Sequence, residues 1–132
     1  MVYLKALQTG STCLSLRMTD LIESYSFGRM KVDGKSYAAD LIIFPDHVYD
    51  RWWRKEGHKL SVDDLKDVWQ AAPEVLIVGT GCYGLMKVPS EVKGQLSAKN
   101  VELIVENTKE AWQTYNRLAP VKKVVAALHV TC

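Results

Sequence analysis

A glycine-rich segment at residues 79–84 is the part of the sequence that most resembles a ligand-binding loop. It reads Gly-Thr-Gly-Cys-Tyr-Gly and follows a short apolar run at residues 75–78. The spacing of its glycines matches a dinucleotide-binding fingerprint, in which the backbone turns tightly and approaches a pyrophosphate. That fingerprint normally leads directly into a long helix, whereas Pro89 prevents a long helix from starting here. Dinucleotide binding is therefore disfavoured, and we expect no cofactor.

Two interpretations of this glycine loop stay open. In the first, backbone amides exposed by the turn bind a small anion or another polar ligand. The residues proposed for that site are Gly79, Thr80, Gly81, Lys87, Arg54 and His58. In the second, the glycines only let the chain turn after a buried strand. The sequence alone does not separate the two.

A second feature is an aromatic and basic segment at residues 51–55, Arg-Trp-Trp-Arg-Lys, which is followed by His58. Such a mixture can hold single-stranded nucleic acid, but adjacent residues of a strand point to opposite faces, so Trp52 and Trp53 cannot form one stacking platform. We therefore expect no nucleic-acid binding. Because Trp and Arg are enriched in interface anchors, Arg51, Trp52 and Trp53 are the predicted contact surface for a protein partner or a homodimer.

The third feature is the pair His129 and Cys132. Both are zinc-ligand types, but a structural zinc site needs four ligands, and Cys82 with His58 or His47 would complete the set only through the fold. Alternatively, Cys132 is a nucleophile, His129 its base, and the terminal carboxylate orients them. On a strand these two residues face opposite sides. We favour a buried thiol and a hydrogen-bonded histidine, with no metal site and no catalytic residue.

Composition limits the class of protein. The chain has 132 residues, of which 48% are apolar, and a formal net charge of +2. These values predict one globular domain without a field that attracts nucleic acid, and the apolar runs fall short of the ~20 residues that span a bilayer. The three cysteines, Cys13, Cys82 and Cys132, cannot all pair within one chain. Free thiols favour a reducing compartment, and we predict the cytoplasm.

The first residues differ from the rest of the chain. Among the first nineteen, Lys5 and Arg17 are charged and no acid occurs, which is also typical of organellar transit segments. A mitochondrial location is therefore the alternative. We expect residues 1–21 to be an N-terminal extension that is partly disordered, and residues 22–132 to form a single domain.

The first half of this domain is predicted to be a β-hairpin. Residues 25–32 and 35–44 are rich in β-branched and aromatic residues, and Asp33-Gly34 between them is a strong two-residue hairpin turn. Pro45 ends the second strand. Residues 48–54 are predicted to be extended, with Trp52 and Arg54 on the same face.

The second half is predicted to alternate strands and helices. A helix begins after Ser61, the apolar run at residues 75–78 is a central strand, and Asn107 or Thr108 caps a helix that ends before Pro120. The other predicted elements are a helix at residues 90–98 and strands at residues 101–105 and 124–130. This alternation predicts a mostly parallel sheet joined to the antiparallel hairpin.

Several short motifs together resemble the adipogenesis-associated domain-containing protein family over residues 22–132. They are Phe27-Gly28-Arg29-Met30, the strand at Tyr37, Trp53-Arg54 with Gly57-His58, Val78-Gly79-Thr80-Gly81 and His129-Val130-Thr131-Cys132. The family is a domain of unknown function that includes bacterial and archaeal proteins and a mitochondrial assembly factor for respiratory complex I. The resemblance implies a three-layer α/β fold around a mixed central sheet, and no established catalytic residues.

Two classes of function follow. We prefer a non-catalytic assembly or interaction protein that binds through the tryptophan segment. The alternative is a protein, or an enzyme, that binds a small anionic or polar ligand at the glycine loop. No Ser-His-Asp signature, phosphate-loop lysine motif or pair of catalytic carboxylates is recognisable, so the sequence gives no positive ground for enzymatic activity.

Overall fold

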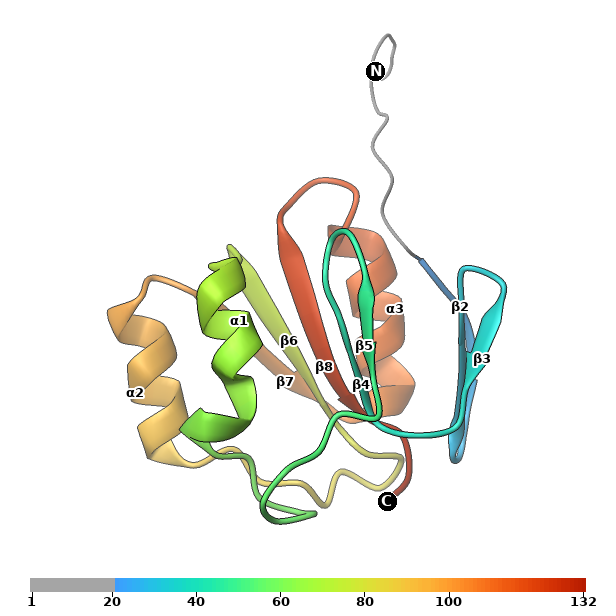
Figure 1. Cartoon of the computed structure of the whole chain (residues 1–132), viewed down its shortest axis with the longest axis horizontal. Coiled ribbons are helices and arrows are strands. Elements are labelled where there is room, and N and C mark those ends of the chain that lie inside the picture. Colours follow the sequence, from blue (N-terminus) through green and yellow to red (C-terminus); the bar gives the residue numbers. More distant parts are fainter. Residues whose placement is uncertain (1–20) are drawn as a thin grey trace, which may run out of the picture.

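The computed structural model describes residues 21–132, and Cys13 and the rest of the predicted extension before Leu21 lie outside the described residues. Two sheets and three α-helices make up the described chain (Figure 1). The elements in chain order are β1 (Ile22–Ser26), β2 (Arg29–Val32), β3 (Lys35–Tyr37), β4 (Leu41–Ile43), β5 (Val48–Asp50), the 3₁₀ turn η1 (Val62–Leu65), α1 (Lys66–Ala71), β6 (Val75–Thr80), α2 (Ser90–Ala98), β7 (Glu102–Glu106), α3 (Thr108–Leu118) and β8 (Val124–His129).

The predicted hairpin is present as part of a small antiparallel sheet with strand order β1-β2-β3. Its turn lies at Asp33 and Gly34, whose φ angles are +48° and +82°, as a tight hairpin requires. The prediction of one strand over residues 25–32 is wrong. Gly28, with a φ of +76°, reverses the chain between β1 and β2, which therefore pair with each other.

The predicted strands at residues 35–44 and 48–54 are also shorter than expected. The first divides into β3 and β4, which belong to different sheets, and Asp40 at the division points into a polar cluster described below. The second ends with β5, because Arg51 has the left-handed φ of +58°. At each break the chain changes direction. The side chains that follow therefore point to a different side than they would on one continuous strand.

The main sheet has the strand order β5-β4-β8-β6-β7. Strand β6 is parallel to both β7 and β8, whereas β4 is antiparallel to β5 and β8. The sheet is therefore mixed, as the family resemblance implies. It is not mostly parallel, as the alternation of strands and helices predicts, because β4 and β5 join it as antiparallel strands. All residues of β6 and β8 are buried. The apolar run at residues 75–78 is central because the sheet is covered on both faces.

The three layers predicted for the domain are confirmed (Figure 1). Helices α1 and α2 cover one face of the main sheet, and α3 with the small sheet covers the other. Helix α3 begins as predicted after Asn107, whose side chain accepts from the amide of Glu110. After Ser61, whose amide donates to Asp64, the chain first forms the 3₁₀ turn η1, and α1 begins only at Lys66. No helix within residues 21–132 is both long and apolar enough to cross a membrane.

Candidate functional site

The main sheet brings three polar residues to one edge. Strands β6 and β8 are parallel, so their last residues, Thr80 and His129, pair side by side. Strand β4 runs the other way beside β8, which places Asp40, just before β4, at the same edge. The carboxyl ends of parallel strands are where open α/β sheets commonly bind ligands. This edge of the main sheet is therefore a candidate ligand site.

Asp40, Arg54 and His129 form a polar cluster at this edge. The Arg54 Nη1 atom donates to Asp40 Oδ2 at 2.7 Å, and His129 Nδ1 lies 2.8 Å from the same oxygen. The other carboxylate oxygen accepts from the amide of Val130 at 2.8 Å. Burial by itself raises the pKa of Asp40, but the hydrogen bonds from His129, Val130 and Arg54 outweigh it and hold the pKa below its ordinary value. Asp40 is thus a carboxylate that neutralises Arg54.

Arg54 is consequently a structural residue in this fold. Its side chain is 4% exposed, its second terminal nitrogen donates to the Gly57 carbonyl at 2.7 Å, and its guanidinium lies 4.8 Å from the centre of the Trp52 ring. The prediction that Arg54 holds an external anion does not fit this position. Its charge is used by Asp40, a residue that the sequence analysis did not single out.

Trp52 also lies inside, contrary to its place in the predicted interaction surface. The residue is 4% exposed, and its indole nitrogen donates to the Asp64 carbonyl at 2.9 Å. The neighbouring Trp53 is 72% exposed. The two indoles therefore point in opposite directions, one into the core and one to the surface, and do not form one stacking platform, as expected.

The glycine loop packs closely against the rest of the protein. A Cβ atom at Gly79 would lie 2.8 Å from both the Leu128 side chain and the Thr108 hydroxyl oxygen. At Gly81, whose φ is +105°, a Cβ atom would lie 2.5 Å from the carbonyl oxygen of Cys132. Both glycines are therefore required by packing and backbone conformation, as the interpretation of the loop as a structural turn predicts.

The amides of the loop are directed at the protein. The Gly81 amide donates to the Thr108 hydroxyl, and the Cys82 amide donates to the carbonyl of Thr131. Further along, the amides of Leu85 and Met86 donate to the carbonyls of Cys132 and Thr80. The Thr80 hydroxyl itself donates to the Glu106 carbonyl at 3.2 Å. These donors are not directed at an external anion.

His58 and Lys87 are the proposed ligand residues that remain on the surface. They are adjacent because the Lys87 amide donates to the His58 carbonyl at 2.8 Å. The Nε2 atom of His58 lies 3.8 Å from Cys132 Sγ, and its ring meets the His129 ring edge-on, with 5.7 Å between the ring centres. The structure thus places His58 within hydrogen-bonding distance of the Cys132 sulfur, whereas the sequence suggested only His129 as its base.

Tyr25 closes the other side of this edge. Its hydroxyl donates to the Val130 carbonyl at 2.8 Å. Burial, together with the neighbouring Cys82, raises the pKa of Tyr25 above its ordinary value, so the phenol stays protonated.

Within residues 21–132, no three histidine, cysteine or acidic side chains are placed to bind a metal ion together.

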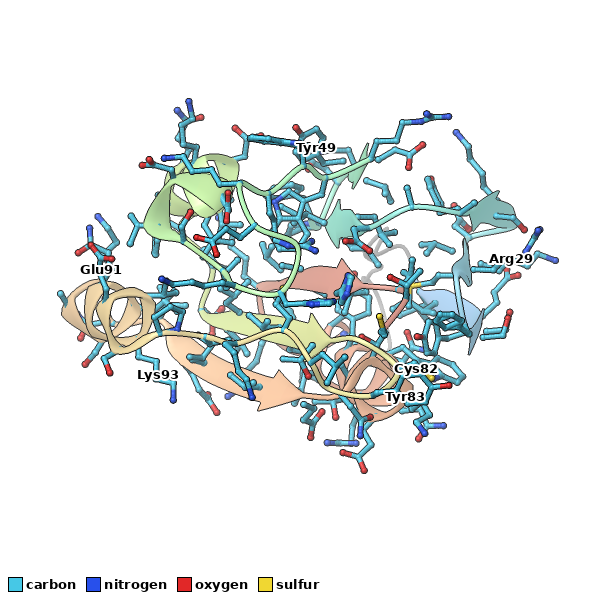
Figure 2. All side chains as sticks on the ribbon, turned by 90° about the horizontal axis from the view of Figure 1, so that it is seen from below. Arg29, Tyr49, Cys82, Tyr83, Glu91 and Lys93 are labelled. Carbon is cyan, nitrogen blue, oxygen red and sulfur yellow. The ribbon has the colours of Figure 1, made fainter. Side chains whose placement is uncertain are left out.

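The exposed part of the tryptophan segment forms a second candidate site. We call Tyr49, Arg51 and Trp53 the Trp53 surface; all three are exposed and lie on or just after the edge strand β5. A groove of about 460 Å³ adjoins it. The groove is lined by Ile42, Tyr49, Trp52, Trp53, Lys55, Asp63, Asp64, Lys66 and Asp67. In Figure 2, Tyr49 lies at a different edge of the molecule from Cys82 and Tyr83.

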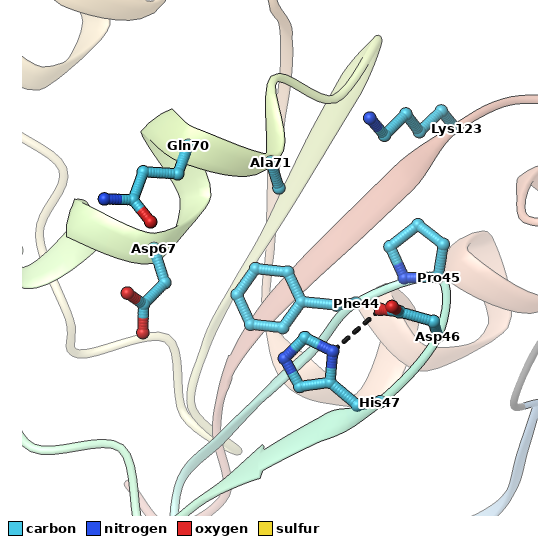
Figure 3. Close-up of a pocket in the computed structure, with 8 residues that line it drawn as sticks. All are labelled: Phe44, Pro45, Asp46, His47, Asp67, Gln70, Ala71 and Lys123. Atoms are coloured by element: carbon cyan, nitrogen blue, oxygen red, sulfur yellow. Dashed lines mark hydrogen bonds and ion pairs between the residues drawn. The ribbon is translucent and has the colours of Figure 1, made fainter.

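A larger cavity of about 680 Å³ lies between the turn after β4 and helix α1 (Figure 3). Phe44 and His47 stack there with 4.6 Å between their ring centres, and Asp46 contacts His47 Nδ1 at 2.7 Å. That hydrogen bond lowers the pKa of Asp46. The cavity contains none of the residues predicted to bind a ligand, so sequence reasoning did not indicate it.

Comparison with known proteins agrees with this architecture. A conserved hypothetical protein from Pyrococcus horikoshii is 32% identical, with a TM-score of 0.73, over 84% of this chain and 98% of that one. A protein from Bartonella henselae, named an outer membrane protein, is 26% identical, with a TM-score of 0.75, over 86% of this chain and 97% of that one.

A Bordetella pertussis protein described as an Mth938-like domain shares the fold at 23% identity, with a TM-score of 0.61, over 84% of this chain and 85% of that one. A model of one protein family matches residues 22–129 of this chain, which is nearly the whole domain. The chain therefore belongs to the family described as protein of unknown function (DUF498/DUF598).

Proposed function

We propose that this protein is a non-catalytic interaction or assembly domain that binds another protein through the Trp53 surface. The observation that carries the proposal is the position of Trp53, a large apolar side chain that is 72% exposed beside a groove. Tryptophan is among the residues that most often dominate binding energy at protein interfaces.

The segment around Trp53 is held in place before any partner binds. On one side, the Trp52 amide donates to the Asp40 carbonyl at 2.8 Å and its indole is buried. On the other side, Arg54 is fixed by its ion pair with Asp40. Because both neighbours are anchored, Trp53 loses little backbone freedom on binding, which lowers the entropic cost of association.

The indole offers enough apolar area to act as an anchor. A tryptophan that becomes fully buried removes about 150–250 Å² from water, which contributes on the order of 4 kcal/mol before the costs of association. A contact of this size needs surrounding complementarity to become specific. The adjoining groove supplies a place for it.

The charges of the groove indicate the kind of partner. Lys55 and Asp63 form an exposed ion pair at 3.0 Å, and Asp64 accepts from the amides of Lys55 and Ser61. Asp67 and Lys66 complete the charged lining, in which carboxylates outnumber lysines. The best complement is a partner segment with an apolar side chain for the indole and a basic residue for the acidic rim.

The resemblance to the adipogenesis-associated domain-containing protein family supports the same proposal. That family includes an assembly factor for respiratory complex I, and an assembly factor works by binding other proteins. We extend this role to the present chain, with the cytoplasm as its proposed location and the mitochondrion as the alternative.

The test is quantitative co-purification of tagged protein from its native cells. We expect Trp53→Ala to lose a partner that the wild-type chain retains, because the variant removes the anchor without disturbing the core. Val121→Ala is the matched control, since Val121 is 74% exposed and lies elsewhere. Identical sets of partners for wild type and Trp53→Ala would contradict the proposal.

A small anionic ligand near the glycine loop is the second candidate function. It is favoured by one observation, the adjacent positions of His58 and Lys87 on the surface. Thermal unfolding with and without inorganic phosphate tests it. A stabilisation that is lost in Lys87→Ala supports this candidate, and no stabilisation of the wild-type protein removes it.

A further inference from the structure

Cys132 and His58 form a pair that can exchange a proton. The sulfur lies 3.8 Å from His58 Nε2, the cysteine is half-buried, and the histidine is exposed. The thiolate is the reactive form of cysteine, and an imidazole within hydrogen-bonding distance is a common acceptor for the thiol proton. We call Cys132 and His58 the thiol site.

The backbone around Cys132 is fixed on two sides. The Val130 carbonyl accepts from the Gly28 amide at 2.8 Å, and the Cys132 carbonyl accepts from the Leu85 amide at 3.2 Å. Between them, the Thr131 carbonyl accepts from Cys82. These bonds attach residues 130–132 to the turn between β1 and β2 and to the glycine loop. The thiol therefore has a defined place in the fold.

A second observation, at His129, also indicates that the thiol site binds a ligand. The residue is 5% exposed, and its Nε2 atom has no hydrogen-bond partner within residues 21–132. Asp40 is bonded to Nδ1, so in the neutral ring the unshared electron pair is on Nε2. Unpartnered buried polar atoms are uncommon in folded proteins and call for an explanation.

The free edge of the His129 ring lies close to the backbone of Cys132. The bond between Cδ2 and Nε2 lies opposite Nδ1 in the ring. A Cβ atom at Gly81 would lie 2.8 Å from His129 Cδ2 and 2.5 Å from the Cys132 carbonyl oxygen, so this edge and Cys132 meet at Gly81. The ring also meets His58 edge-on. The two imidazoles therefore lie close to each other beside Cys132.

Two cations flank the thiol site. Lys59 and Lys87 are exposed and are joined by a parallel backbone bridge, and the Lys87 amide bonds to His58. Neither lysine side chain forms an ion pair with another described residue. Glu56, the nearest acid along the chain, bridges Lys59 through its backbone. The two ammonium groups favour an anionic reactant at the thiol site.

We propose that Cys132 is a thiol–disulfide exchange site for small anionic disulfides, of which oxidised glutathione is the probe. The Cys132 S–H bond breaks and its proton passes to His58 Nε2. The thiolate then attacks one sulfur of the disulfide, whose S–S bond breaks as the new bond to Cys132 Sγ forms. The leaving thiolate takes the electron pair and recovers the proton from His58. Cys132 becomes a mixed disulfide, and the other half of the reactant is released as a thiol.

The experiment follows mixed-disulfide formation on the full chain by peptide mapping and mass spectrometry. The reactants are oxidised glutathione, which is anionic, bis(2-hydroxyethyl) disulfide, which is neutral, and cystamine, which is cationic. Rates are normalised to those of each reactant with the urea-unfolded chain. We expect Cys132 to react about tenfold faster than Cys82 with oxidised glutathione, and the normalised rates to fall from the anionic to the neutral to the cationic reactant.

Variants separate the parts of the site. His58→Gln should slow the reaction of Cys132 with all three reactants, whereas Lys59→Gln combined with Lys87→Gln should remove only the preference for the anionic one. Cys82→Ser is the matched control and should leave the rate at Cys132 unchanged. Thermal unfolding of each variant verifies that it is folded. The proposal is overturned if folded wild-type Cys132 reacts no faster than Cys82, or if its normalised rates do not depend on the charge of the reactant.

Discussion

One short segment, residues 51–54, contributes Arg54 to the polar cluster and Arg51 and Trp53 to the Trp53 surface, and it uses similar residue types in opposite ways. Trp52 and Arg54 point inward, where the indole is buried and the guanidinium is paired with Asp40. Arg51 and Trp53 point outward and are exposed. The indole and the guanidinium of the inward side chains are hydrogen-bonded within the protein, whereas the outward side chains leave apolar area exposed to solvent. Position along this segment therefore separates what stabilises the fold from what is available to a partner.

The largest loss of stability is expected when Asp40, the counterion of the inward Arg54, is replaced. Asp40→Ala leaves the Arg54 charge buried without its counterion and removes the acceptor of the Val130 amide. Breaking one partner of a buried ion pair costs about 3–5 kcal/mol of unfolding free energy. Urea unfolding monitored by circular dichroism measures the loss. A loss below about 1 kcal/mol would show that the cluster contributes little to stability.

The next effect is expected at the glycine loop. Gly81→Ala adds a Cβ atom that meets the Cys132 backbone, at a φ of +105° that other residues rarely adopt. We expect a loss of about 2–4 kcal/mol from strain and overpacking. Gly94→Ala is the control, because nothing lies within 4 Å of a Cβ atom at Gly94 in helix α2. That variant should gain about 0.5–1 kcal/mol from helix propensity, and equal effects of the two would contradict the packing argument.

The pH dependence of stability tests the charge of Asp40 in the polar cluster, because Asp40→Asn keeps nearly the same side-chain size. The pKa of Asp40 is lowered in the folded state, so its carboxylate contributes stability above its unfolded pKa of about 4. This contribution is lost as the pH falls through the lower folded-state pKa. We expect the stability difference between wild type and Asp40→Asn to shrink from pH 6 toward pH 2 in urea-unfolding series. A constant difference would mean that ionisation of Asp40 is not what stabilises the cluster.

The sequence predicted the order of the main strands and helices well, because they depend on local patterns, whereas the three layers were implied by the family resemblance. The apolar run at residues 75–78, the capped start of α3 at Asn107 and the turn at Asp33-Gly34 each act over a few residues, and each is present. The wrong strand lengths have a different origin. The breaks at Gly28 and Arg51 depend on positive φ angles that serve tertiary contacts.

The candidate sites were harder to predict because their contacts are distant along the chain. Asp40 and His129 are 89 residues apart, and His58 and Cys132 are 74 apart. Spacing gives no measure of such distances. One signal was present in the sequence: Asp40 is an acid that immediately precedes the apolar residues of β4, where a charge requires a partner.

The smallest effect on stability is expected at Trp53, and it tests the comparison most directly. Trp53→Ala should change the unfolding free energy by no more than about 0.5 kcal/mol, because the side chain is 72% exposed. Trp52→Ala, the same substitution one residue earlier, should cost about 3–5 kcal/mol, because it empties a buried volume and removes the bond to Asp64. Both values come from urea unfolding of the isolated protein. If Trp53→Ala were as destabilising as Trp52→Ala, the exposed indole would be part of the core, and its loss could not be used to test for a partner.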